Sequence, residues 1–237
     1  MFYWLIPLIL GIVLLSVFLV FRVKEKRVTA VIIKGLVSLM FMATAIVAWQ
    51  TSNNPQSTFG IYVLIAMFFG LLGDVFLDLK YIVLQKEILY TILGFCAFGI
   101  GHIFFTIGLF THFFSFTSSA LYIVIPIIIT LVLLAITLLM EVFTKIRYQK
   151  MKPFVIAYGL CLFFTVSIYG SAMIQNGCNT QFILLAVGFV SFMLSDLILN
   201  NTYFAPGFTS PGFIISNHIL YYAAQFLIAV SLFYLPL

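Results

Sequence analysis

The stretch Ala120–Met140 reads ALYIVIPIIITLVLLAITLLM and decides the fold class of this chain. It contains no charged side chain and is long enough, at ~1.5 Å of rise per residue, to cross the ~30 Å hydrocarbon core of a bilayer. A backbone in lipid must satisfy its own hydrogen bonds, which a single segment does by forming an α-helix. This stretch therefore predicts a transmembrane helix.

Seven further apolar runs of similar length occupy most of the remaining chain. Turn signals such as Thr51–Pro55 separate them, and Pro153 lies where a helix tolerates proline, in its first turn. Hydrophobic residues make up 64% of the 237 residues and charged residues 7%, against roughly a quarter in soluble domains. We therefore expect a single domain, 1–237, an all-α polytopic transmembrane bundle of about eight helices. The expected spans are Tyr3–Phe21, Val28–Gln50, Phe59–Leu79, Ile88–Phe110, Ala120–Met140, Pro153–Ile174, Gln181–Asn200 and Phe213–Leu235.

The basic residues follow the first, third and fifth spans, and the loops after the second, fourth and sixth contain none. The positive-inside rule then places the odd-numbered loops in the cytoplasm and both termini outside. Loop Asn201–Gly212 has no basic residue, so a miscount there would reverse the C-terminus. We expect an integral multi-pass membrane protein. The host membrane is either a bacterial cell membrane or a eukaryotic endomembrane, and the sequence does not decide between them. The basic residues that set this topology are Arg22, Lys24, Lys26, Arg27, Lys80, Lys86, Lys145, Arg147, Lys150 and Lys152.

The net charge of +5 follows from this topology and does not indicate a nucleic-acid partner. The cysteines Cys96, Cys161 and Cys178 form no CxxC pair and are best explained as small apolar residues. We expect membrane lipids as partners and no cofactor, and leave the oligomeric state open.

Intramembrane polar residues are the informative exceptions, because a charge near the centre of a span costs roughly 2.5–3.5 kcal/mol. Asp74 and Asp78 share one face of the third span, with Asp74 about 8 Å inside its cytoplasmic end. Lys34 and Asp196 lie at similar depths in the second and seventh spans. Polar groups from several spans therefore reach one depth, which predicts a polar pocket in the cytoplasmic half. The last span adds Asn217, His218, Tyr221, Tyr222 and Gln225 at helical spacing.

Structural explanations compete with functional ones at several of these positions. Lys34 can extend its ammonium to the interface, and Asp78 can be a solvated helix-end residue. The tyrosines and Gln225 can be interhelical hydrogen-bonding groups, and His102 a hydrogen-bonded core histidine. Asp74 and Asp196 are the hardest to explain structurally.

Four short motifs in different spans resemble those of one known family of membrane proteins. Gly73-Asp74-Val75-Phe76-Leu77 is similar to its GDxxL motif, and Ser195-Asp196 to its SD motif. The Phe98–His102 stretch resembles an F-x-x-x-H block, and Tyr221–Gln225 a YYxAQ ending. Lys34 and Tyr158 match a lysine and a tyrosine of the second and sixth spans. Through these motifs the chain resembles the YhhN-like lysoplasmalogenase family over almost its whole length. Asp78 is less typical of the motif.

The resemblance implies a membrane hydrolase that cleaves the vinyl ether bond of lysoplasmalogens to a fatty aldehyde and glycerophosphoethanolamine or glycerophosphocholine. Vinyl ether hydrolysis needs an acid that protonates carbon and a carboxylate that stabilises the resulting cation, as in glycosidases. We assign Asp74 and Asp196 to this pair without deciding which is the acid, and Lys34 to the head-group phosphate. The residues expected to bind substrate, a lysophospholipid, are Lys34, Asp78, His102, Tyr158, His218, Tyr221, Tyr222 and Gln225.

Two other functions compete with this one. A metal-dependent membrane hydrolase would need about three histidines and a carboxylate around zinc. The three histidines of this chain have no HxxxH or HxxE spacing, so we expect no metal site. A transporter or channel could use intramembrane aspartates to relay protons or bind cations. No internal repeat supports a transporter, and aldehyde release would separate the two functions.

Overall fold

The computed structural model describes residues 2–25, 27–113, 119–207 and 210–236, and Lys26 and part of the loop 201–212 lie outside these ranges. Within them, eight helices are long and apolar enough to cross a membrane, as the sequence predicted. Short 3-10 turns η1 (Leu84–Lys86), η2 (Gln149–Met151) and η3 (Leu232–Tyr234) adjoin three of them. The helices are α1 (Leu5–Val23), α2 (Arg27–Gln50), α3 (Thr58–Leu79), α4 (Glu87–His112), α5 (Leu121–Phe143), α6 (Lys152–Asn176), α7 (Thr180–Phe204) and α8 (Pro211–Ser231).

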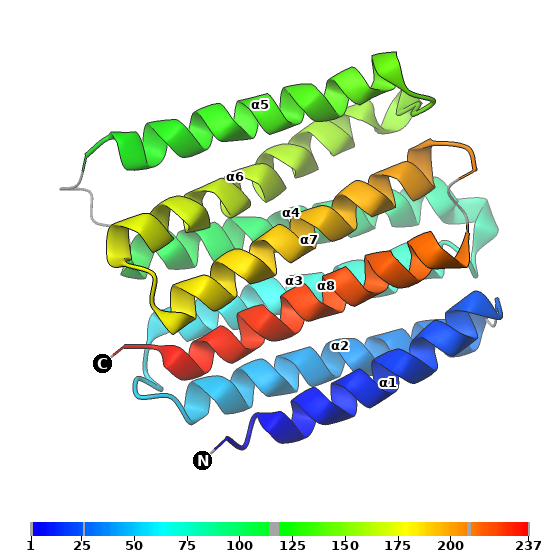
Figure 1. Cartoon of the computed structure of the whole chain (residues 1–237). Coiled ribbons are helices and arrows are strands. Elements are labelled where there is room, and N and C mark those ends of the chain that lie inside the picture. The colour runs from blue at the N-terminus through cyan, green and yellow to red at the C-terminus, as the bar shows by residue number, and fades with distance from the viewer. Residues whose placement is uncertain (1, 26, 114–118, 208–209, 237) are drawn as a thin grey trace.

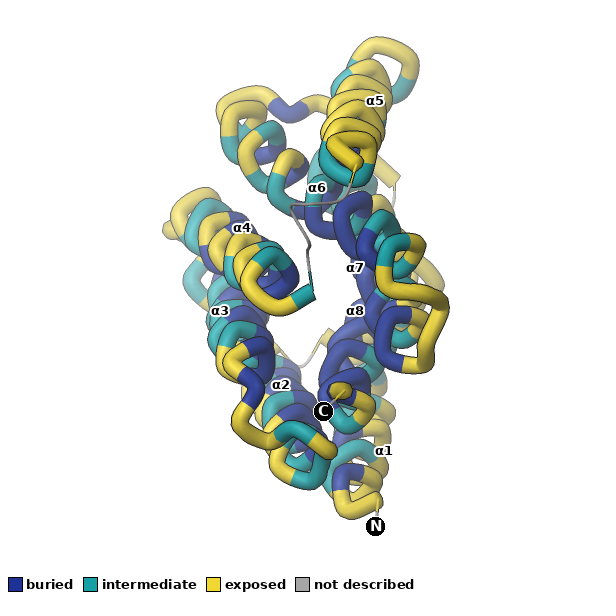
Figure 2. Tube along the Cα trace, turned by 90° about the vertical axis from the view of Figure 1, so that its left-hand side faces the viewer, coloured by how far each residue is buried: buried dark blue, intermediate teal, exposed yellow. Residues whose placement is uncertain are grey.

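Successive helices run in opposite directions in one bundle (Figure 1). Seen along the helices, α2, α3 and α4 form one row and α6, α7 and α8 face them, with α1 and α5 at the two ends (Figure 2). Contacts of α2 with α8 and of α4 with α6 close the two rows onto each other. Buried residues line the facing sides, while α1 and α5 are largely exposed, as expected for helices that face lipid.

The end of α7 differs from the sequence prediction. The polar run from Asn200 to Thr202 indicated a loop from Asn201, but α7 continues to Phe204. The polar side chains are satisfied within the helix: the amide of Asn201 donates to the carbonyl of Leu197 (2.8 Å) and the Thr202 hydroxyl to that of Leu199 (2.8 Å). The extra turn brings Tyr203 to the end of the bundle that carries the basic loops.

Gly73 lets α3 and α4 approach closely beside the expected site. A Cβ at this position would lie 2.6 Å from the ring of Phe98, closer than side-chain packing permits. The glycine in the Gly73-Asp74 motif therefore has a packing function. It lets Phe98 lie against α3 next to Asp74.

Both termini lie at the end of the bundle opposite the basic loops (Figure 1). The orientation in a membrane stays a prediction: reporter fusions after residue 236 and before residue 2 should both report an outer location. A glycosylation or phosphatase reporter that is active at one terminus but not at the other would contradict the eight-span topology.

Candidate active site

A cavity of about 310 Å³ opens at the basic-loop end of the bundle, between α2, α3, α7 and α8. Arg22 in the last turn of α1, together with the exposed Glu25 and Arg27 that follow this helix, lines its mouth. Its walls include most of the residues for which the sequence predicted a common pocket. These are Lys34, Asp74, Asp78, Asp196, His218 and Tyr221.

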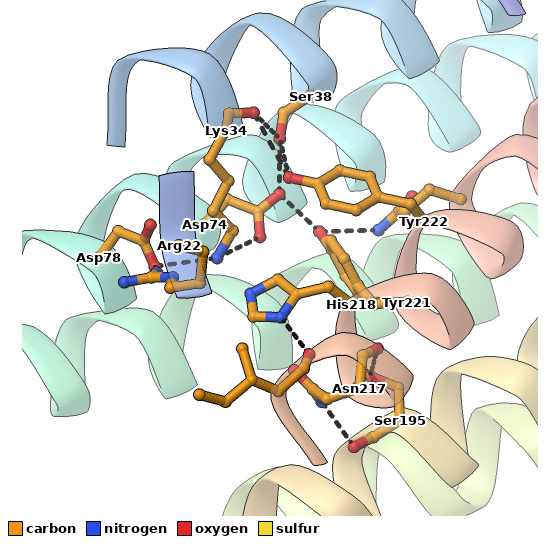
Figure 3. A network of polar contacts seen from close by, with 12 residues as sticks. Arg22, Lys34, Ser38, Asp74, Asp78, Ser195, Asn217, His218, Tyr221 and Tyr222 are labelled. Carbon is orange, nitrogen blue, oxygen red and sulfur yellow. Dashed lines mark hydrogen bonds and ion pairs between the residues drawn. The ribbon is translucent and has the colours of Figure 1, made fainter. Parts of the chain in front are cut away.

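Asp74, on α3, is buried and accepts bonds from side chains of two other helices, α2 and α8 (Figure 3). Its Oδ2 accepts hydrogen bonds from the hydroxyls of Ser38 (2.7 Å) and Tyr221 (2.8 Å), and its Oδ1 lies 3.2 Å from the ammonium of Lys34. An ammonium and two hydroxyl donors stabilise a buried carboxylate in its ionised form.

Asp78 lies one turn further along α3 and shares the same ammonium. Its Oδ1 is 3.2 Å from Lys34 and is also paired with the guanidinium of Arg22. Its Oδ2 is buried and has no hydrogen-bond partner among the described residues. Two cations and two anions are thus linked in one ion-pair network, and their formal charges sum to zero: Arg22, Lys34, Asp74 and Asp78.

Asp196 has a different environment from the two aspartates of α3. Its Oδ2 accepts a hydrogen bond from the hydroxyl of Tyr158, whose ring stacks on Phe95 with centroids 5.6 Å apart. In the described part of the chain, no cationic side chain lies within ion-pair distance of this carboxyl. One carboxyl of the cavity is therefore ion-paired and another is held by a neutral hydroxyl.

The polar residues of α8 mostly hold the wall in place. The amide of Gln225 donates to the hydroxyl of Tyr221 (3.2 Å), and the hydroxyl of Tyr222 donates to the carbonyl of Lys34 (3.3 Å). The Asn217 amide donates to the carbonyl of Ser195 (2.8 Å), and the Ser195 hydroxyl returns a bond to the carbonyl of Asn217 (3.0 Å). This reciprocal pair fixes α7 to α8 at the position of Asp196.

The two histidines expected to bind substrate, His102 and His218, lie in two different places. His218 lines the cavity, and its Nδ1 is bonded to the carbonyl of Ile214 (2.7 Å) while its ring lies against Phe18. His102 lines a separate apolar cavity of about 380 Å³ between α4, α5 and α6. Neither ring nitrogen of His102 has a partner among the described residues, and its ring centroid lies 5.9 Å from that of Tyr158.

The structure thus gathers the expected residues only in part. Three of them do not line the cavity but are hydrogen-bonded to residues that do: Tyr158 to Asp196, Tyr222 to Lys34 and Gln225 to Tyr221. His102 does not line it either. Sequence reasoning missed Arg22 and Ser38. The spacing of Ser38 four residues after Lys34 on α2 was the available signal for the serine.

The lysine at the end of α3 lies beside the cavity mouth. Burial lowers the pKa of Lys80 to about 7, against the attraction of Glu87 and Asp78. Its ammonium lies 3.1 Å from the ring centroid of Tyr203 and 5.0 Å from that of Tyr81. Aromatic faces therefore supply part of the stabilisation that water would otherwise give this ammonium.

The described residues contain no group of three or more histidine, cysteine, aspartate or glutamate side chains arranged to hold a metal ion. The side chains that line the cavity include carboxyl, hydroxyl, amide, ammonium, guanidinium and imidazole groups.

Comparison with known proteins identifies the family. The model of the YhhN family matches residues 29–232, which covers most of the chain and includes Lys34, the aspartates and the polar face of α8. No curated protein and no solved structure matched the chain. With this match and eight apolar helices, the chain is a polytopic helical membrane protein that belongs to the YhhN family.

Proposed function

We propose that this protein hydrolyses the vinyl ether bond of lysoplasmalogens in the membrane. The observation that carries the proposal is the presence in one cavity of two carboxyls with opposite surroundings, Asp74 and Asp196. Acid–base hydrolysis of an enol ether needs such a pair, with one carboxyl neutral and the other ionised.

Asp196 is the proton donor in this mechanism. Asp196 is half-buried, and partial burial without a cationic neighbour favours the neutral form of a carboxyl; the hydrogen bond from Tyr158 holds it in place. Its proton goes to the carbon of the C=C bond that is remote from the ether oxygen. The electron pair of the double bond forms the new C–H bond and leaves an oxocarbenium ion.

Asp74 is the ionised partner. Lys34, Ser38 and Tyr221 hold it as a carboxylate, whose charge stabilises the oxocarbenium ion and orients a water molecule. The water oxygen bonds to the cationic carbon and loses a proton, which restores the acid. The hemiacetal then breaks its C–O bond to glycerol: its hydroxyl loses a proton as the C=O bond forms, and the departing glycerol oxygen gains one, giving a fatty aldehyde and the glycerophospho head group.

The proposal is tested with the purified protein in detergent and a synthetic 1-alkenyl-glycerophosphoethanolamine. We expect equal amounts of fatty aldehyde and glycerophosphoethanolamine. A 1-alkyl analogue, which has no vinyl double bond to protonate, should stay intact. Absence of aldehyde, together with uptake of solutes or ions by vesicles that contain the protein, would favour a transporter or channel over the hydrolase.

We expect hydrolysis to be insensitive to chelation. A carboxyl supplies the proton and an ion-paired carboxylate the charge, so no step requires a Lewis acid. Aldehyde release should therefore continue at the same rate after dialysis against a strong chelator. A loss of activity with EDTA that zinc restores would contradict the two-carboxyl mechanism.

A further inference from the structure

The ion pair between Arg22 and Asp78 lies at the mouth of the cavity and is incompletely satisfied on both sides. Each residue uses part of its hydrogen-bonding capacity in this pair. Among the described residues, the Nε of Arg22 and the Oδ2 of Asp78 are both buried without a partner. A buried ionic group with an open donor or acceptor position is costly, so these atoms mark positions where a ligand would gain bonds.

Arg22 can change its partner without disturbing the core. Its guanidinium carbon lies 4.7 Å from the ring centroid of Tyr81 and 5.6 Å from that of Phe18, so aromatic faces hold the cation. It comes from the last turn of α1, a helix that is mostly exposed and that lies outside the residues matched by the family model.

The other cations at the cavity are less suited to bind an anion. Lys34 lies 3.2 Å from both Asp74 and Asp78, so its charge is already used. Arg27 is exposed and donates to the carbonyl of Tyr81 (3.3 Å) at the rim. A planar guanidinium with an open Nε–H is also the better geometric match for two phosphate oxygens.

We propose that a zwitterionic lipid head group exchanges with the Arg22–Asp78 pair: its phosphate binds Arg22 and its ammonium binds Asp78. Each protein ion then keeps an opposite charge as a partner, so the exchange leaves no buried charge unpaired. The inference rests on the proposed function and deepens it, because it places the head group at the mouth and the ether bond further in, near Asp74 and Asp196.

Binding of non-cleavable ether lipids tests the proposal independently of catalysis. The ligands are 1-alkyl-glycerophosphoethanolamine with both charges, 1-alkyl-glycerol-3-phosphate with the phosphate only, and 1-alkylglycerol with neither. Arg22→Gln should weaken binding of the two phosphate ligands about 10- to 100-fold, the value of a hydrogen-bonded charge, and leave alkylglycerol binding unchanged. Asp78→Asn should weaken binding of the ethanolamine ligand but not of the phosphate-only ligand.

Lys24→Gln is the matched control, since it removes one positive charge from an exposed residue next to the same helix end. We expect it to leave all three affinities unchanged. Equal weakening of all three ligands by Arg22→Gln would assign Arg22 a structural role and overturn the proposal, as would an effect of Lys24→Gln as large as that of Arg22→Gln. Displacement of the ether lipid by inorganic phosphate at equal concentration would assign the site to free phosphate and overturn it too. If the three ligands bind as expected but the protein cleaves no vinyl ether, only the proposed hydrolase activity is refuted.

Discussion

Asp196→Asn is expected to lower the turnover of lysoplasmalogen by about 10²–10⁴-fold, the usual contribution of general acid catalysis. Asparagine keeps the volume of the side chain and can still accept the hydrogen bond from Tyr158. It cannot donate a proton of useful acidity to carbon, so the chemical step should fail while substrate binding remains. Aldehyde release by purified protein measures kcat, and elution as a single monodisperse peak verifies the fold.

Two further variants make this result specific. Asp74→Asn should also lose turnover, because the amide keeps the bond from Ser38 but has no charge to stabilise the oxocarbenium ion. Tyr158→Phe should cost less than Asp196→Asn, since it removes only the group that holds the acid in place. Near-normal turnover of the Asp196→Asn variant would refute the assignment of Asp196 as the proton donor.

The fold could be predicted from the sequence because each span is decided locally. About twenty consecutive apolar residues suffice for a helix that crosses a bilayer, and the turn signals between them separate one helix from the next. The one clear error was the end of α7, where polar residues were interpreted as a loop. Those side chains bond to carbonyls of their own helix, which a hydropathy pattern does not reveal.

For the candidate site, the sequence predicted only the depth in the membrane at which the polar residues lie. Lys34, Asp74 and Asp196 stand at similar distances from their helix ends, and the structure places them around one cavity. Depth does not determine which face of a helix a residue occupies, and neither does a family motif. His102 was expected at the site because of the family resemblance, but it lines another cavity between α4, α5 and α6.

Arg22 was missed for a different physical reason. A basic residue that directly follows an apolar run is what membrane topology requires, so the sequence explained it without any further function. Only the three-dimensional arrangement shows that Arg22 lines the cavity and that its guanidinium is paired with Asp78, 56 positions further along the chain. The division between an ion-paired and an unpaired carboxyl likewise depends on packing between helices.

Lys34→Met is expected to destabilise the folded protein by about 3–5 kcal/mol, the cost of removing one partner from a buried ion pair. Methionine fills a similar volume but leaves Asp74 and Asp78 enclosed with Arg22 as the remaining cation of the chain. Unfolding of the purified protein in mixed micelles with increasing SDS measures the change in the free energy of unfolding.

The double variant Lys34→Met with Asp74→Asn tests whether charge balance is the cause. It removes one cation and one anion, so Arg22 and Asp78 remain as an ion pair and no net charge is left buried. The double variant should therefore be more stable than Lys34→Met alone, a coupling that a double-mutant cycle measures directly. If the two changes were additive, the ammonium of Lys34 would matter for packing and not for the charge of Asp74. In that case the argument that Asp74 is kept ionised by Lys34 would fail, and with it the distinct roles assigned to the two carboxyls of the cavity.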